Sequence, residues 1–251
     1  MTSLITKEEF KQKLIHLIDH QDINNLSVLK EILEDKSNIT DDYPSSPTKP
    51  SLDKIKSTGE KAFQRAIFNG KYSMLDFKRG KVSAEKVTWI DIELPVVLNK
   101  NPRRRCIDLI GSMDGVPVLC ELKYKEKSPS DHPLYAIIEI LMYRYLIHCN
   151  YEKLDKHEVH HNFYNNFRWE IIVKNRFPQI LVVANKSYWD YWFNRISKDE
   201  FVQNAFELGS ELDTNIHLFE APDEDFINQK GNKESYKPTL TSNYWEKLTT
   251  G

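Results

Sequence analysis

Hydrophobic residues three and four positions apart run through the first 36 residues, with a break at Asn24 and Asn25. This spacing places the apolar side chains on one face of each of two short helices. The next stretch, 37–51, holds three prolines among serines, threonines and aspartates, a composition that sustains neither a helix nor a strand. We therefore predict an N-terminal helical pair at 1–36, a linker at 37–51 and a core that begins at Leu52.

From Leu52 onwards, stretches with helical spacing alternate with stretches rich in β-branched and aromatic residues. Thr58 and Ser130–Asp131 are the expected helix caps, and Asn69–Gly70 is the expected end of the first core helix. Asp114–Gly115 is a strong hairpin signal, so the strands on either side of it are predicted to pair. The expected elements, in chain order, are a helix at 58–68, strands at 87–97, 106–113 and 116–124, a long helix from Ser130, a strand at 179–184, a helix after it and a strand near 218.

The run YWDYWF at 188–193 is the densest group of aromatic side chains in the chain. Aromatic rings stack on unpaired nucleic-acid bases, but rings that follow a buried strand also begin helices that pack on a sheet. Because this run follows the apolar strand QILVVA almost directly, we expect the second arrangement here.

Composition indicates an ordinary soluble protein. The chain has 251 residues, of which 40% are hydrophobic and 29% are charged, which is enough for one core with an appendage. No apolar run approaches the roughly 18 residues that span a bilayer, and the start of the chain has no apolar signal-peptide region. Its three cysteines form no CxxC pair, which favours reduced thiols. We therefore expect a cytoplasmic protein that does not enter a membrane.

The net charge of −2 excludes a uniformly basic surface for nucleic acid. Between positions 100 and 127, however, seven basic residues stand against four acidic ones. Such a patch contacts phosphates in some proteins and is only a solvated surface in others, and the sequence leaves both open. The residues of this patch that we consider for nucleic-acid binding are Lys100, Arg103, Arg104, Arg105 and Lys125.

Three charged residues interrupt the apolar hairpin. Side chains alternate along a strand, so Glu121 and Lys123 point to one face while Cys120 and Leu122 point to the other. The Asp-Gly turn folds the strand of Asp108 back against that of Glu121, which brings two carboxylates and one ammonium together. Burying three charged groups is costly unless they are paired or bind a metal.

Two carboxylates in one place suit Mg²⁺ or Mn²⁺, and the carbonyl of Leu122, between the two charged side chains, is available as a further ligand. An ion there would activate water and neutralise phosphate charge, while Lys123 would stabilise the transition state of phosphodiester hydrolysis. The alternative is a half-exposed salt bridge between Glu121 and Lys123 with Asp108 opposite. The combination of an acid, a hairpin and an ExK motif favours the metal site.

The sequence CIDLIG, followed by DGVPVLCELKY and YAIIEILMY, resembles the PD-(D/E)xK nuclease superfamily, in particular its RecB-like branch. The resemblance implies that Asp108, Glu121 and Lys123 bind the metal and carry catalysis. It also implies an α/β fold with a restriction-endonuclease-like core, in which a central mixed β-sheet is flanked by helices in the order αβββαβ. On this basis we expect the nuclease-like core at 52–225 and a C-terminal tail at 226–251.

Two further family positions have counterparts in this chain. The resemblance places Glu60, in the first core helix, among the metal-binding and catalytic residues, although the helix dipole alone also favours an acid in a first turn. The RecB-like branch carries Gln-x3-Tyr on the helix after ExK, and here the pair is Glu139 and Tyr143, with an acid in place of the glutamine. Residues four apart share a helix face, so we expect both to face the metal site as catalytic residues.

The leading hypothesis is therefore a Mg²⁺-dependent endonuclease or exonuclease that acts on DNA rather than RNA. A second hypothesis is a catalytically inactive nuclease-like domain that binds nucleic acid or a protein. The net charge of −2 favours this second hypothesis, and the intact Asp108, Glu121 and Lys123 oppose it. In either case the N-terminal helical pair is available to form a homodimer or to dock to a protein partner.

Overall fold

The computed structural model describes residues 49–52, 59–76, 84–96, 106–125, 131–160, 167–174, 178–212, 214–221, 226–227, 238–240 and 242–250. All of them belong to one unit of the chain, Ile39–Gly251. The predicted N-terminal helical pair at 1–36 and most of the predicted linker lie outside these residues. Four of the five residues considered for nucleic-acid binding also lie outside them, namely Lys100, Arg103, Arg104 and Arg105.

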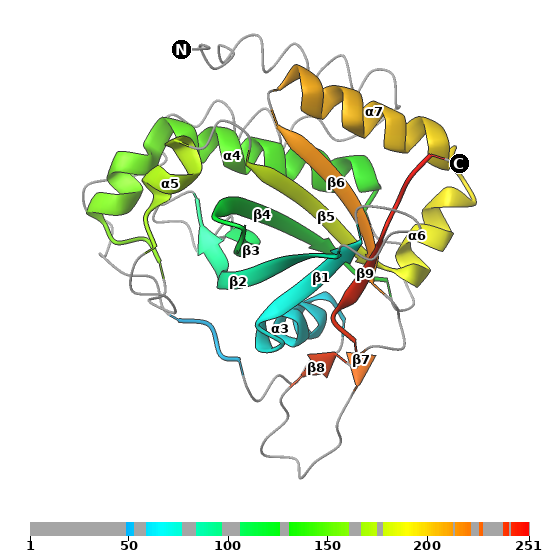
Figure 1. Cartoon of the computed structure of the whole chain (residues 1–251), viewed down its shortest axis with the longest axis horizontal. Helices are drawn as coiled ribbons and strands as arrows, with labels where there is room; N and C mark the ends of the chain where they lie inside the picture. The colour runs from blue at the N-terminus through cyan, green and yellow to red at the C-terminus, as the bar shows by residue number, and fades with distance from the viewer. Residues whose placement is uncertain are drawn as a thin grey trace. The chain divides into compact units, whose positions relative to one another are not determined.

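The described residues form a mixed structure of helices and strands (Figure 1). Its elements, in chain order, are α3 (Glu60–Asn69), β1 (Tyr72–Asp76), β2 (Ala84–Pro95), β3 (Cys106–Met113), β4 (Val116–Lys123), α4 (Pro133–Lys156), α5 (Trp169–Lys174), β5 (Gln179–Asn185), α6 (Lys186–Phe193), α7 (Lys198–Glu211), β6 (Asn215–Ala221), β7 (Phe226–Ile227), β8 (Thr239–Leu240) and β9 (Tyr244–Lys247). Strand β1 was not predicted, because its five residues, YSMLD, are too few to show a clear alternation. None of the helices described here is long and apolar enough to cross a membrane.

Seven strands close into a mixed barrel in the order β1-β2-β3-β4-β5-β6-β9. The prediction of a restriction-endonuclease-like α/β core, an open central sheet flanked by helices, is therefore wrong. Strand β9 causes the closure, because it pairs in parallel with β1 and antiparallel with β6. It thereby joins two edges that would otherwise expose unpaired backbone groups. The stretch 226–251, expected as a tail outside the core, thus supplies the strand that completes the sheet.

The β3–β4 hairpin forms as predicted. Asp114 and Gly115 both have positive φ angles, 48° and 83°, as a two-residue type I′ turn requires. The start of the following helix differs from the prediction. His132, rather than the predicted Ser130–Asp131, is the N-cap of α4, and its side chain accepts a hydrogen bond from the N–H of Leu134 at 3.2 Å.

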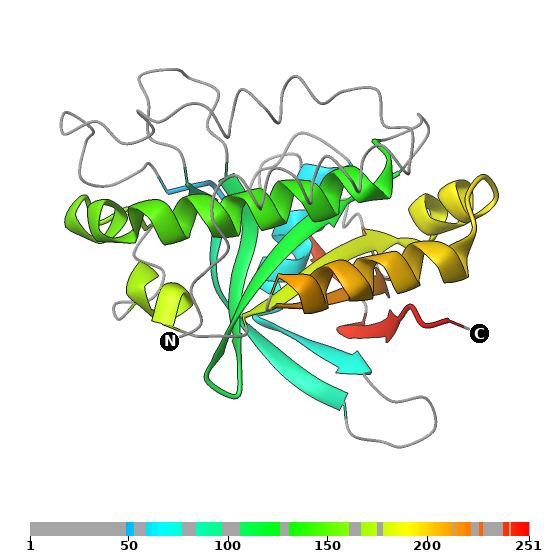
Figure 2. The same ribbon diagram turned by 90° about the horizontal axis from the view of Figure 1, so that it is seen from above.

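Strand β4 is covered on both faces. Helix α3 packs against β1 to β4, and its Phe63 and Ile67 belong to the same buried cluster as Cys120 and Leu122 of β4. Helix α4 crosses the opposite face of β4 and β5, and α7 covers β6 (Figures 1 and 2). Burial along β4 is therefore nearly continuous instead of alternating. The face of β4 that carries Glu121 lies under α4.

Gly111 marks a close approach between β2 and β3. A Cβ at this position would lie 2.8 Å from Val87 Cγ1 and 3.0 Å from both the Thr88 carbonyl oxygen and Trp89 Cε3. Since Val87 and Trp89 are buried, they have little room to yield. We expect Gly111→Ala to lower the free energy of unfolding by about 1–3 kcal/mol, measured by urea denaturation. The adjacent Ser112→Ala is the control, and an equal, small effect of both substitutions would contradict the close approach.

Candidate active site

Strands β3 and β4 separate at the end remote from their turn, and the candidate site begins there. Their pairing ends at Leu109 and Cys120, whereas β3 stays paired with β2 as far as Cys106. Asp108 lies at the point of separation. Its Oδ2 accepts a hydrogen bond from the backbone N–H of Leu122 at 2.8 Å. A carboxylate therefore connects the two strands where their backbones no longer pair.

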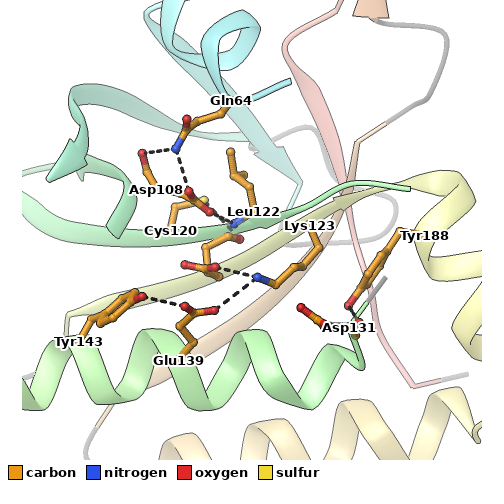
Figure 3. Close-up of polar contacts among 10 residues, drawn as sticks. Gln64, Asp108, Cys120, Leu122, Lys123, Asp131, Glu139, Tyr143 and Tyr188 are labelled. Atoms are coloured by element: carbon orange, nitrogen blue, oxygen red, sulfur yellow. Dashed lines mark hydrogen bonds and ion pairs between the residues drawn. The ribbon is translucent and has the colours of Figure 1, made fainter. Parts of the chain in front are cut away.

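Lys123 lies between two carboxylates (Figure 3). Its Nζ donates to Glu121 Oε1 at 2.9 Å and to Glu139 Oε2 at 3.4 Å. The hydroxyl of Tyr143 donates to Glu139 Oε1 at 2.7 Å, so these two residues of α4 face the site together, as expected from their spacing. Glu121 and Lys123 are only 4% and 7% exposed. The salt bridge between Glu121 and Lys123 that was considered as the alternative does form, but it is buried rather than half-exposed.

A second set of contacts, which was not predicted from the sequence, reaches Asp108 from α3. Gln64 Nε2 donates to Asp108 Oδ1 at 2.8 Å and to the Asp108 carbonyl oxygen at 3.1 Å (Figure 3). Gln64 Oε1 accepts from Arg65 Nη1, and Arg65 is paired with Glu93 at 2.8 Å. Gln64 and Arg65 are both buried. The sequence signal that could have revealed these contacts was the presence of two adjacent polar residues within the apolar face of a helix.

Glu60, Asp131 and Tyr188 border the same space. Glu60 is exposed in the first turn of α3, yet surrounding protein atoms remove enough water to raise the pKa of its carboxyl, against the opposing charge of Lys123. The hydroxyl of Tyr188 donates to the Asp131 carbonyl oxygen at 2.8 Å, and both residues lie near Lys123 in Figure 3. Glu60 therefore lies close enough to Lys123 for their charges to interact, while its role as a metal ligand stays a prediction.

Carboxylates outnumber cations in this site. Burial raises the pKa of Asp108 to about 7, and Glu60 adds to the rise, whereas Lys123 and the Leu122 amide lower it. Burial, followed by the charge of Asp108, raises the pKa of Glu121 well above its usual range. Burial alone would lower the pKa of Lys123, but the surrounding carboxylates, Glu121 first, raise it well above its usual range. Lys123 is therefore an ammonium at neutral pH, and a further cation would relieve the acids.

The residues present fit a divalent ion. Glu121 Oε2 is buried and has no hydrogen-bond partner among the described residues, whereas Oε1 holds Lys123. Each carboxylate oxygen of Asp108 accepts one hydrogen bond and keeps a second lone pair. Across the described ranges no three His, Cys, Asp or Glu side chains form a complete ion site. Mg²⁺ is suited to this, because it usually binds through one or two carboxylates together with waters and substrate phosphate. Asp108, Glu121 and the Leu122 carbonyl are the groups available to hold it.

Lys125 is the one predicted nucleic-acid contact that falls within the described residues. It lies two residues beyond Lys123, at the end of β4, and its ammonium is 5.0 Å from the centre of the Tyr191 ring. The run YWDYWF lies within α6, and Tyr188 and Trp189 are buried as expected. Tyr191 remains partly exposed beside Lys125.

Comparison with known proteins yields no relative. No protein-family model, no curated protein and no solved structure matches this chain. The resemblance to PD-(D/E)xK nucleases therefore rests on the sequence motif, and the function has to be argued from the chemistry of the site.

Proposed function

We propose that this protein is a metal-dependent nuclease that hydrolyses phosphodiester bonds, with DNA as its substrate and with an active site of the PD-(D/E)xK type on a closed sheet. The observation that carries the proposal concerns the two carboxylate oxygens of Glu121. One of its oxygens holds the ammonium of Lys123, and the other is buried without a partner among the described residues. A buried carboxylate oxygen in this state is stabilised by a proton or by a bound cation, and we infer the cation because Asp108 and the Leu122 carbonyl offer further ligands beside it.

Each residue has a role that follows from its contacts. Asp108 and Glu121, with the carbonyl of Leu122, would hold Mg²⁺ or Mn²⁺. When bound, the ion would neutralise charge on the scissile phosphate and lower the pKa of an attacking water. Lys123 stays protonated because its pKa is raised, so it acts as a fixed positive charge beside the phosphate rather than as a general base.

The residues of α4 position that charge. Glu139 receives one hydrogen bond from Lys123 and another from Tyr143, so the lysine is held by α4 as well as by Glu121 of its own strand. A neutral glutamine at position 139 would hold Lys123 with less electrostatic attraction. The acid at this position therefore supports the protonated state of Lys123.

A cleavage assay tests the proposal. The purified full chain is incubated with supercoiled plasmid, linear duplex, single-stranded DNA and RNA, in Mg²⁺, Mn²⁺ or EDTA. We expect cleavage of DNA with either ion and none in EDTA. In parallel, Mg²⁺ is expected to raise the Tm of the wild-type protein, because an ion that binds only the folded state stabilises it.

The matched control is Glu121→Gln, which keeps the size of the side chain and removes its charge. We expect this variant to lose the rise in Tm with Mg²⁺. Cleavage that persists in EDTA, or that is equal in the variant, contradicts a metal-dependent nuclease at this site. Binding of nucleic acid without cleavage of any substrate would favour the inactive nuclease-like domain instead.

A further inference from the structure

Two cations converge on the ring of Tyr191, next to the candidate active site. The Nζ atom of Lys125 lies 5.0 Å from the ring centre, and the guanidinium carbon of Arg195 lies 3.7 Å from it. Arg195 also donates through Nη1 to the Tyr191 carbonyl oxygen at 2.6 Å. Both cations thus contact the same aromatic ring.

The structure fixes the backbone on both sides of this cluster. The side chain of Asn185 accepts from the N–H of Lys125 and donates to its carbonyl oxygen, both at 2.9 Å. Since Asn185 ends β5 and directly precedes α6, this two-way contact ties the end of β4 to the start of α6. Trp189 anchors α6 further by donating to the Phe219 carbonyl oxygen at 2.9 Å. These hydrogen bonds therefore fix the position of the Lys125 backbone relative to the helix that carries Tyr191.

The charges of Lys125 and Arg195 are not neutralised within the described residues, since neither side chain makes an ion pair there. Lys186, at the start of the same α6, behaves differently. It pairs with Asp190 at 3.3 Å and lies 3.8 Å from Glu220. Two cations on one ring, without an ion pair among the described residues, attract an anion. The pair is therefore arranged for an anionic ligand.

The cluster of Lys125, Arg195 and Tyr191 lies close to the candidate active site. Lys125 follows Lys123 by two residues, just beyond the end of β4. Tyr188, one turn before Tyr191 on α6, lies close to Lys123 in Figure 3. The same helix thus borders both the site and the cluster, and a nucleic-acid strand in the site would pass along it.

We propose that Lys125 and Arg195, seated on Tyr191, bind a backbone phosphate of the nucleic-acid strand adjacent to the phosphodiester that is cleaved. This inference rests on the proposed nuclease function. The ligand is the phosphate itself, so the subsite contributes affinity and positioning without reading base sequence. Arg195, which the sequence analysis did not single out, supplies a planar donor group suited to phosphate oxygens.

Salt dependence of binding tests the subsite. Equilibrium binding of a fluorescent single-stranded DNA is measured in EDTA, so that no cleavage occurs, over about 50–200 mM KCl. We expect Lys125→Gln and Arg195→Gln each to weaken binding about 3- to 10-fold. Each lost phosphate contact should also lower the slope of log affinity against log salt by about 0.7. Lys186→Gln, on the same helix and already ion-paired, should change neither quantity.

The outcomes separate this subsite from the nuclease proposal. If wild type binds and cleaves DNA but the Lys125→Gln, Arg195→Gln double variant keeps its affinity and salt slope, the subsite is wrong and the nuclease stands. If wild type neither binds nor cleaves any nucleic acid, both proposals fail together. Unchanged Tm values in all variants establish that the fold is intact. Lower affinity with an unchanged salt slope would also overturn the subsite, because a phosphate contact must release counterions.

Discussion

Lys123→Met is expected to slow phosphodiester cleavage by about 10³-fold while leaving Mg²⁺ binding intact, because in the proposed mechanism the lysine supplies transition-state charge rather than a ligand. Methionine keeps most of the length of the side chain and removes the ammonium. That ammonium is buried, and the surrounding carboxylates keep it protonated by raising its pKa. In the proposed reaction, the substitution therefore removes one fixed positive charge from the place where negative charge develops on the phosphate.

Although cleavage is expected to slow in Lys123→Met, the binding of Mg²⁺ is not expected to weaken. Without Lys123, the carboxylates of Glu121 and Glu139 lose the cation they share, and the site becomes more negative. Mg²⁺ should then bind as tightly as in wild type or more tightly, since like charges no longer repel it. Titration of Tm against Mg²⁺ measures this. The variant should unfold at a lower temperature in EDTA and recover when the ion is added.

Lys153→Met, at an exposed position on α4, is the matched control and should cleave at the wild-type rate. Two results would contradict the role of Lys123. Retained cleavage in Lys123→Met would remove it from the chemistry. Loss of Mg²⁺ binding together with cleavage would mean that the lysine only supports the shape of the site.

Short-range sequence patterns predict the β3–β4 hairpin but do not determine that the sheet closes. The β3–β4 hairpin depends on two turn residues and on alternation within a few positions of each other, so the sequence predicts it well. Closure depends on β9, whose register with β1 and β6 joins Tyr244–Lys247 to strands that begin at Tyr72 and Asn215. Pairing over such a separation leaves no periodic signal in four residues. The overall architecture was therefore predicted wrongly although several of its elements were predicted where they form.

The candidate site also has contacts that the sequence predicts and contacts that it does not. Glu121 and Lys123 are two residues apart on one strand, and Glu139 and Tyr143 are four apart on one helix, so their shared faces follow from backbone geometry. Contacts between these pairs then required only that α4 cover β4, which it does. The partner of Gln64 could not be predicted, because it depends on how α3 packs against the separated ends of β3 and β4. No residue spacing in the sequence predicts which group a buried polar side chain of that kind contacts.

Gln64→Leu is expected to weaken Mg²⁺ binding by about 10- to 100-fold, the usual cost of removing a residue that orients a metal ligand. Gln64 donates to both the carboxylate and the carbonyl oxygen of Asp108, so its amide fixes the direction of the carboxylate. Leucine has a similar volume but no donor, and Asp108 would keep only its hydrogen bond from the Leu122 amide. Cleavage at low Mg²⁺ should fall in proportion, and saturating Mg²⁺ should restore most of the rate.

This recovery distinguishes Gln64 from Lys123, whose loss no concentration of Mg²⁺ should repair. Asn69→Leu is the matched control, because Asn69 is also an amide on α3 but donates to the carbonyl oxygens of Pro238 and Leu52, away from Asp108. Both variants lose amide hydrogen bonds and should lose stability, yet only Gln64→Leu should shift the Mg²⁺ dependence of cleavage and of Tm. Equal shifts in both variants would reduce Gln64 to a packing residue, because the ion would then respond to the stability of α3 and not to the orientation of Asp108.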